Sequence, residues 1–174
     1  VFAAMLLAAR DVVGGINWAA SQVDNANVAE DTEKEKKKFA GYELSGKKLG
    51  VIGLGAIGRL VANTAIHLGM EVYGYDPYIS VDAAWNLSKN VLHSKDIKEI
   101  YANCDYITIH VPLMDSTRGM VGAEAFTLTK PHAVLINLAR DVLVDEKAIP
   151  FTAANTALIR VNETTWTEAA YATP

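Results

Sequence analysis

Three glycines in one short stretch, residues 48–62, most constrain what this chain can fold into. They are Gly53, Gly55 and Gly58, and their spacing matches the fingerprint G-x-G-x-x-G of dinucleotide-binding folds. In that fingerprint the first glycine permits a tight turn and the second lets main chain approach a pyrophosphate. The third lets the next helix pack close to the strand. Unpaired N–H groups at the start of that helix hold the phosphates.

The residues around the motif support this interpretation. Residues 49–52 predict a buried strand before it, and Ile57, Leu60 and Val61 recur at helical spacing after it. Residues 71–75 predict a second strand, which ends in Asp76, near the spacing at which an acid binds the adenosine ribose. An acid there would repel a 2′-phosphate, which favours NAD over NADP. The alternative is a glycine turn in an unrelated α/β protein.

Composition bounds the class of protein. The 174 residues allow one good domain and little more, and 51% hydrophobic residues fit a packed core. A net charge of −4 gives no sign of binding to nucleic acid or to an anionic membrane. The single cysteine, Cys104, fits a reduced, cytoplasmic compartment. The apolar residues 2–9 lack a preceding basic segment, so we interpret them as part of a buried helix beside a missing N-terminus rather than as a signal peptide.

The first 41 residues differ in character from the rest. Residues 1–22 predict one long amphipathic helix, with a weak point at Gly14–Gly15. Trp18 either packs in the core or contacts a second subunit. Residues 23–41 mix acids with lysines and predict a solvated segment. The apolar stripe expected on the long helix consists of Phe2, Leu6, Ala9, Val13, Ile16 and Ala20.

Strands and helices alternate in the remaining sequence. Pro112 ends one strand and residues 138–140 follow another, which predicts both segments at the carboxyl ends of strands, where ligands bind in open α/β sheets. Residues 1–150 therefore predict one α/β domain of the Rossmann type, a doubly wound parallel sheet with helices on both faces. Residues 151–174 stay an unassigned tail, in which residues 157–161 allow a strand. The other expected elements are a short strand at 90–92, a helix capped by Ser94, a strand at 105–111, a helix at 123–129, a strand at 132–137 and a short helix capped by Asp145.

These motifs, in this order, resemble the NAD-binding domain of the D-2-hydroxyacid dehydrogenases. The resemblance extends from the first helix to about Ile149. It implies an NAD-dependent oxidoreductase that transfers a hydride between NAD and C2 of a D-2-hydroxy acid. Within the family, residues 76–80 and Arg140–Asp141 look most like the members that act on 3-phosphoglycerate in serine biosynthesis. The matching stretches are residues 50–58, 74–78, 110–113, 117–119, 137–140 and 143–146.

The resemblance implies a role for each matched residue. Arg140 would be catalytic, binding the substrate carboxylate and polarising the 2-oxygen, because a planar guanidinium matches a carboxylate through two parallel hydrogen bonds. The alternative is a surface ion pair of Arg140 with Asp141 or Asp145. No metal site is expected. The residues that would bind NAD are Gly53, Gly55, Ala56, Ile57 and Gly58 at the pyrophosphate, Asp76 at the ribose, and Val111, Pro112, Thr117, Leu138 and Ala139 on the nicotinamide side.

The chain departs from the family after Arg140. The family's substrate domain is built from both ends of the chain, and most of it is absent here. The acid and the histidine that move the proton would follow Arg140, but the sequence motifs that precede them in the family do not occur here. Glu168 lies near the expected distance for the acid, in a stretch that does not match. The histidines, none of which suits the relay, are His67, His93, His110 and His132.

Other functions stay open at this point. One is a non-catalytic NAD(H)-binding regulatory module, and another is a family member acting on lactate, glycerate or formate. A purely structural dimerisation domain is the third. The family implies a small 2-hydroxy or 2-oxo acid as substrate, no nucleic-acid or membrane partner, and a homodimer through the NAD-binding domain in which residues 1–22 take part. We expect this chain to bind NAD but to turn over poorly.

Overall fold

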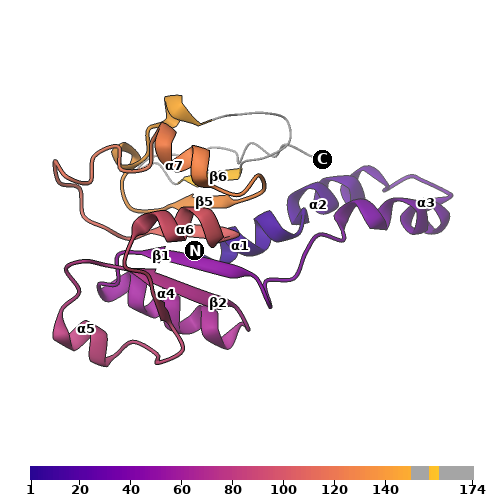
Figure 1. The fold of residues 1–174 in the computed structure, drawn as a ribbon. Helices are drawn as coiled ribbons and strands as arrows, with labels where there is room; N and C mark the ends of the chain where they lie inside the picture. Colours follow the sequence, from indigo (N-terminus) through magenta and orange to yellow (C-terminus); the bar gives the residue numbers. More distant parts are fainter. Residues whose placement is uncertain (150–156, 161–174) are drawn as a thin grey trace. The chain divides into compact units, whose positions relative to one another are not determined.

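The computed structural model describes residues 1–149 and, for the main chain alone, residues 157–160. The chain divides into two compact units, Phe2–Leu44 and the residues from Ser45 onward. Figure 1 shows the second unit as a twisted sheet between layers of helices. The second unit contains every site residue that the sequence predicts.

A six-stranded sheet forms the centre of the second unit. Every neighbouring pair of strands is parallel, and the order is β3-β2-β1-β4-β5-β6. This is the order of doubly wound dinucleotide-binding folds, so the predicted fold class is confirmed. The strands are β1 (Lys48–Ile52), β2 (Glu71–Tyr75), β3 (Leu92–His93), β4 (Tyr106–Ile109), β5 (Val134–Asn137) and β6 (Ala157–Arg160).

Helices cover both faces of this sheet (Figure 1). On one face α4 (Ala56–His67) contacts β1 and β2, and on the other α6 (Ile97–Asn103) packs beside α7 (Ala123–Leu128). All residues of β4 are buried, as a parallel strand covered on both faces requires. The core under α6 and α7 includes Ile52, Ile100, Ile107, Ile109, Phe126 and Leu135. The shorter elements are α5 (Val81–Trp85) and the 3-10 helices η2 (Asp141–Leu143) and η3 (Glu146–Ala148).

Asp105 joins the starts of three strands. Its carboxylate accepts hydrogen bonds from the Lys48 N–H and from Lys130 Nζ, both at 2.8 Å, and its carbonyl accepts the Val134 N–H at 2.8 Å. Burial alone would raise the pKa of Asp105, but these hydrogen bonds and the charge of Lys130 outweigh burial and hold the pKa below its ordinary value. The cluster lies at the amino ends of the strands, opposite the predicted site.

The first unit contains α1 (Phe2–Ala9), α2 (Val12–Ser21), α3 (Val28–Glu35) and the 3-10 helix η1 (Lys36–Phe39). The prediction of one helix over residues 1–22 is wrong, because the helix is interrupted at Arg10–Asp11. Asp11 caps α2, since its Oδ1 accepts the N–H of Gly14 at 2.9 Å. A Cβ at position 14 would lie 2.1 Å from that carboxylate, so the glycine makes room for the cap.

Burial in the first unit also differs from the predicted stripe. Met5 and Ala9 are buried in α1, whereas α2 has no buried residue and exposes Val13 and Ile16. The predicted stripe is therefore a real periodicity of apolar residues, but it is not the buried face of these helices. Whether α2 contacts a second subunit stays a prediction.

Trp18 packs within the first unit. Its ring lies 6.1 Å from that of Phe39, centroid to centroid, in a tilted arrangement.

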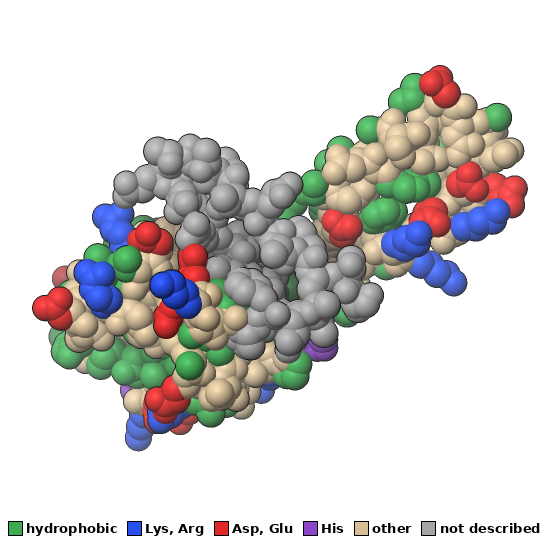
Figure 2. All heavy atoms as spheres, turned by 90° about the horizontal axis from the view of Figure 1, so that it is seen from above, with side chains coloured by type: hydrophobic (Ala, Val, Ile, Leu, Met, Phe, Trp, Pro, Cys, Tyr) green, Lys and Arg blue, Asp and Glu red, His purple; other side chains and the backbone are tan. Residues whose placement is uncertain are grey.

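The charged segment, residues 23–41, has the features predicted for a solvated surface. Its helix α3 has no buried residue, and Lys34 pairs with Glu30 at 2.6 Å. On the face drawn in Figure 2, acidic and basic side chains of the first unit lie next to one another.

The third strand and the helix after it begin later than predicted. β3 covers Leu92–His93, and α6 starts after Asp96, whose side chain accepts the N–H of Lys98 at 2.9 Å. The prediction that Ser94 caps this helix is wrong. Its hydroxyl is buried, and no partner for it occurs in the part of the chain that the structure describes.

The last described elements agree with the sequence. Asp145 caps η3 by accepting the Lys147 N–H at 3.2 Å, and β6 confirms a strand within residues 157–161. The domain boundary at residue 150 stays a prediction. Within residues 1–149 and 157–160, no helix combines the length and the apolar character needed to cross a membrane.

Candidate functional site

Neighbouring strands end in one row at the same edge of the sheet. The register pairs Ile52 of β1 with Tyr75 of β2 and with Ile109 of β4, and Ile109 with Asn137 of β5. Ligands of open α/β sheets bind at this edge, where the strand order reverses between β1 and β4. The structure thus brings the predicted site segments to one rim, and the first residues to leave the strands there are Gly53, Asp76, His110 and Leu138.

Gly53 and Gly58 are required by close main-chain contacts. Gly53 has φ +91°, a left-handed conformation, and a Cβ on it would lie 2.8 Å from the carbonyl oxygen of His110. A Cβ on Gly58 would lie 1.8 Å from the carbonyl oxygen of Gly53. The first helical turn of α4 therefore rests directly on the end of β1, as the fingerprint predicts.

Gly55 faces open space. Apart from its two chain neighbours, no atom of the described residues lies within 4 Å of the position that its Cβ would occupy, and Gly55, Ala56 and Ile57 are exposed. No side chain caps α4 at Gly55, so the helix start offers N–H groups to an outside acceptor. Bare main chain at the positive end of a helix fits a pyrophosphate.

The carboxylate of Asp76 points at the glycine turn. Its Oδ2 accepts the N–H of Leu54 at 2.8 Å, and its Oδ1 accepts the N–H of Tyr78 at 2.9 Å. A carboxylate has about four acceptor positions, so about two remain for other donors. The side chain is half-buried and held in place, which fits a group that binds the two hydroxyls of a ribose.

The loop after β4 carries Val111, Pro112 and Thr117. Thr117 Oγ1 donates to the carbonyl of Pro112 at 2.8 Å and accepts the N–H of Met114 at 2.9 Å, so one hydroxyl folds the loop back on itself. Pro112 is exposed, while Val111 and Thr117 are half-buried. These predicted nicotinamide contacts follow directly from the rim.

The loop after β5 carries Leu138, Ala139 and Arg140. Asn137, the last residue of β5, binds this loop through both ends of its amide: Nδ2 donates to the Arg140 carbonyl at 2.6 Å, and Oδ1 accepts the Ala139 N–H at 3.2 Å. Arg140 itself is exposed. The two loops are also joined, because the Gly119 N–H donates to the Val142 carbonyl at 2.8 Å.

His110 packs beneath the glycine turn. Its Cβ lies 3.4 Å from where a Cβ on Gly58 would be, and its Nε2 lies 2.9 Å from Thr108 Oγ1. Burial lowers the pKa of His110 to about 4, so the ring is neutral near pH 7. It contributes packing and a hydrogen bond to the rim, and not a charge.

The other histidines lie on other elements of the fold. His67 ends α4, His93 ends β3, and His132 precedes β5 at its amino end. Glu168 lies outside the described residues. No group of three or more His, Cys, Asp or Glu side chains within the described ranges could hold a metal ion.

Sequence reasoning missed the roles of Asn137 and Leu54. An amide at the end of a buried strand, shortly before a functional loop, is a signal for side-chain to main-chain hydrogen bonding, and it was available for Asn137. Leu54 offers no such signal, because its contribution to Asp76 comes from its main-chain N–H.

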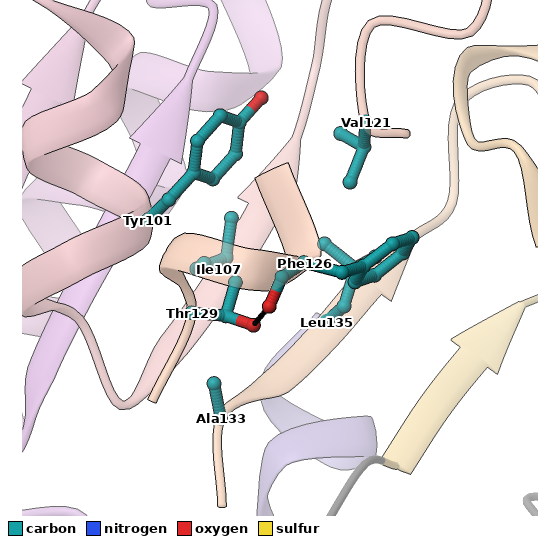
Figure 3. Close-up of a pocket in the computed structure, with 7 residues that line it drawn as sticks. All are labelled: Tyr101, Ile107, Val121, Phe126, Thr129, Ala133 and Leu135. Atoms are coloured by element: carbon teal, nitrogen blue, oxygen red, sulfur yellow. Dashed lines mark hydrogen bonds between the residues drawn. The ribbon is translucent and has the colours of Figure 1, made fainter. Parts of the chain in front are cut away.

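A small apolar hollow lies under α6 and α7, away from the rim (Figure 3). Both hydroxyls in its lining bind main-chain carbonyls: Tyr101 binds Met120 at 3.4 Å, and Thr129 binds Phe126 at 2.9 Å. The other side chains in the lining are apolar, so the hollow offers little to orient a polar ligand. It is part of the core and not a second site. Its lining consists of Tyr101, Ile107, Val121, Phe126, Thr129, Ala133 and Leu135.

Comparison with known proteins agrees with this geometry. The chain is similar to D-3-phosphoglycerate dehydrogenase of Methanocaldococcus jannaschii, with 45% identity over 117 residues, which are 67% of this chain and 22% of that protein. The enzyme of the same name from Sus scrofa is 40% identical over 145 residues, 83% of this chain and 27% of that protein. A crystal structure of 3-phosphoglycerate dehydrogenase from Entamoeba histolytica with NAD+ bound superposes with a TM-score of 0.59 and 28% identity, covering 72% of this chain and 40% of that one.

The chain thus spans only 22% to 27% of the length of the first two relatives. The family described as D-isomer specific 2-hydroxyacid dehydrogenase, NAD binding domain, matches residues 2–160. That range includes the glycine turn, Asp76, Arg140 and all strands of the sheet. The chain therefore belongs to the D-isomer specific 2-hydroxyacid dehydrogenases, as an NAD-binding domain of that family.

Proposed function

We propose that this chain serves a dehydrogenase that transfers a hydride between NAD and the 2-carbon of a D-2-hydroxy acid. The observation that carries the proposal is the common register row of β2, β1, β4 and β5. It brings the glycine turn, Asp76 and the loop carrying Arg140 to one rim. The two relatives compared above bear the name D-3-phosphoglycerate dehydrogenase, which favours 3-phosphoglycerate as the substrate.

In this proposal, NAD binding divides among three segments. The main chain at Gly53, Gly55, Ala56, Ile57 and Gly58 binds the pyrophosphate, because it is bare and lies at the start of α4. Asp76 binds the ribose hydroxyls, and its negative charge repels a 2′-phosphate, which favours NAD over NADP. Val111, Pro112, Thr117, Leu138 and Ala139 bound the nicotinamide side.

Arg140 is the proposed catalytic residue. Its guanidinium binds the substrate carboxylate through two parallel hydrogen bonds and polarises the 2-oxygen, which stabilises negative charge developing there. NAD, when bound, supplies or accepts the hydride exchanged at C2. Proton movement at the 2-oxygen needs an acid–histidine pair whose surrounding motifs are missing after Arg140, so we expect weak turnover by this chain.

We also propose a cytoplasmic homodimer. Cys104 is a buried free thiol, which suits a reducing compartment. The dimer proposal rests on α2, which has no buried residue and leaves Val12, Val13 and Ile16 exposed within its own unit. Analytical ultracentrifugation of the chain and of Ile16→Glu tests it, and a monomeric wild-type chain would contradict it.

Calorimetric titration with NAD and NADP, followed by an assay of 3-phosphoglycerate oxidation at high protein concentration, tests the main proposal. We expect NAD to bind at least tenfold more tightly than NADP, with little or no turnover. Failure to bind either nucleotide would overturn the proposal. Efficient turnover would show that the relay argument is wrong. A longer protein containing this chain that bound NAD but lacked activity on every 2-hydroxy acid would favour the regulatory module.

A further inference from the structure

We propose that Asn137 is a positioning residue that fixes the main chain from which the Arg140 side chain extends. The proposal rests on the function proposed above, in which Arg140 binds a carboxylate. Its starting point is that the two ends of one amide bind main chain on the loop carrying Arg140, at the Arg140 carbonyl and the Ala139 N–H.

Asn137 is rigidly anchored. It is only 4% exposed, and its main chain is the last residue of β5, paired with Ile109 of β4 and with Arg160 of β6. A buried side chain on a strand held from both sides has little freedom to move. Through its two hydrogen bonds, the amide therefore holds the main chain of the loop at a fixed position relative to the sheet.

The Arg140 carbonyl is the point at which the loop is held. It accepts Asn137 Nδ2 at 2.6 Å and also the N–H of Leu143 at 3.3 Å. Leu143 is fully buried and its own carbonyl accepts the N–H of Val121 at 3.1 Å, which joins this loop to the one after β4. The main chain of an exposed arginine is thus fixed from the strand and from the neighbouring loop.

A fixed main chain matters here because recognition through two parallel hydrogen bonds depends on direction. Binding groups must be held within about 0.5 Å and 10–20° of the productive geometry. Only an amide of this length supplies a donor to the Arg140 carbonyl and an acceptor to the Ala139 N–H. An aspartate keeps the acceptor but places a carboxylate oxygen against a carbonyl oxygen, and a leucine of similar size supplies neither.

The experiment compares Asn137→Asp, Asn137→Leu and Arg140→Lys with the wild-type chain. The probes are NADH and, on the NADH-loaded chain, oxamate, a small anion that resembles a 2-oxo acid. We expect both Asn137 variants and Arg140→Lys to weaken oxamate binding at least tenfold, while NADH affinity stays within twofold. In Asn137→Asp alone, oxamate binding should recover at acid pH, because a protonated carboxyl again donates to the Arg140 carbonyl. Thermal unfolding of each variant confirms that it is folded.

Wild-type oxamate affinity in both Asn137 variants would overturn the proposal and leave the role of Arg140 intact. A parallel loss of NADH and oxamate affinity would also overturn it, because Asn137 would then be a general structural residue. Absence of oxamate binding to the wild-type chain, or its retention in Arg140→Lys, would instead contradict the role of Arg140 itself, and this proposal with it.

Discussion

The carboxylate of Asp76 accepts the main-chain N–H of Leu54 at 2.8 Å, so the end of β2 is bound to the glycine turn that follows β1. The acid that the sequence predicts to bind ribose therefore also holds the turn that is proposed to bind the pyrophosphate. Two parts of the proposed nucleotide site are therefore joined by a single hydrogen bond before any ligand arrives. This preorganisation lowers the entropic cost of binding.

Replacing Asp76 by asparagine should weaken NAD binding by about tenfold to a hundredfold. Asparagine keeps one oxygen for Leu54 but loses the charge and the second acceptor, and hydrogen bonds to charged groups contribute about 1.5–3 kcal/mol. NADP binding should fall less, because repulsion of its 2′-phosphate is removed as well. Calorimetric titration with both nucleotides measures the change. An unaltered ratio of NAD to NADP affinity would contradict the role of Asp76.

Alanine at Gly58 should reduce the stability of the fold, whereas alanine at Gly55 should reduce the affinity for NAD. At Gly58 the new Cβ meets the Gly53 carbonyl oxygen at 1.8 Å, so α4 must move and the free energy of unfolding should fall by about 1–3 kcal/mol. At Gly55 the Cβ meets no other side chain or main chain within the described residues, so the free energy of unfolding should be unchanged while NAD affinity drops at least tenfold. Urea denaturation and NAD titration of both variants separate the effects. Retention of full NAD affinity in Gly55→Ala would show that no phosphate approaches this residue.

The fold was predictable because its signals are local. The spacing of Gly53, Gly55 and Gly58 and the apolar run of β4 each depend on a few neighbouring residues. The helix break at Arg10–Asp11 was not predictable, because the apolar periodicity continues across it unchanged. The decisive contact, from Asp11 to the N–H of Gly14, competes with helix formation in a way that periodicity does not record.

The candidate site was predictable only in part. Residue types at strand ends indicated which loops matter, but their placement in one row depends on the pairing of Ile52, Tyr75, Ile109 and Asn137, which are far apart in sequence. Contacts made by main-chain atoms leave no trace in residue identity. Residue identity can also mislead. Ser94 is a residue type that often caps helices, but the cap of α6 is Asp96, two positions later.

Replacing Lys130 by methionine should lower the free energy of unfolding by about 1–2 kcal/mol. Lys130 Nζ and the Asp105 carboxylate are only partly exposed, so removing the amine leaves a carboxylate with one fewer partner at the start of β4. Screening by water keeps the loss below that of a buried pair. The matched control is Lys98→Met, which removes the exposed pair with Glu124 and should leave stability unchanged. Equal effects of the two variants in urea denaturation would contradict this difference.

The stability of the chain should depend on His110 between about pH 4 and pH 6.5. Burial lowers the pKa of His110 to about 4 in the folded state, whereas the unfolded ring titrates near 6.5. Across that window the unfolded chain binds more protons, so His110 favours unfolding as the pH falls. The contribution at pH 5, relative to pH 7, is about 1–2 kcal/mol after allowance for partial exposure of the ring.

His110→Gln tests this dependence, because glutamine does not titrate and can still reach Thr108 Oγ1. Urea denaturation of both chains at pH 5 and pH 7 gives four free energies of unfolding. The wild-type chain should lose about 1–2 kcal/mol more than the variant on acidification. Every other titrating group is common to the two chains, so its contribution cancels in the comparison. Equal losses would mean that the His110 ring takes up a proton in the folded chain, and that burial does not keep it neutral.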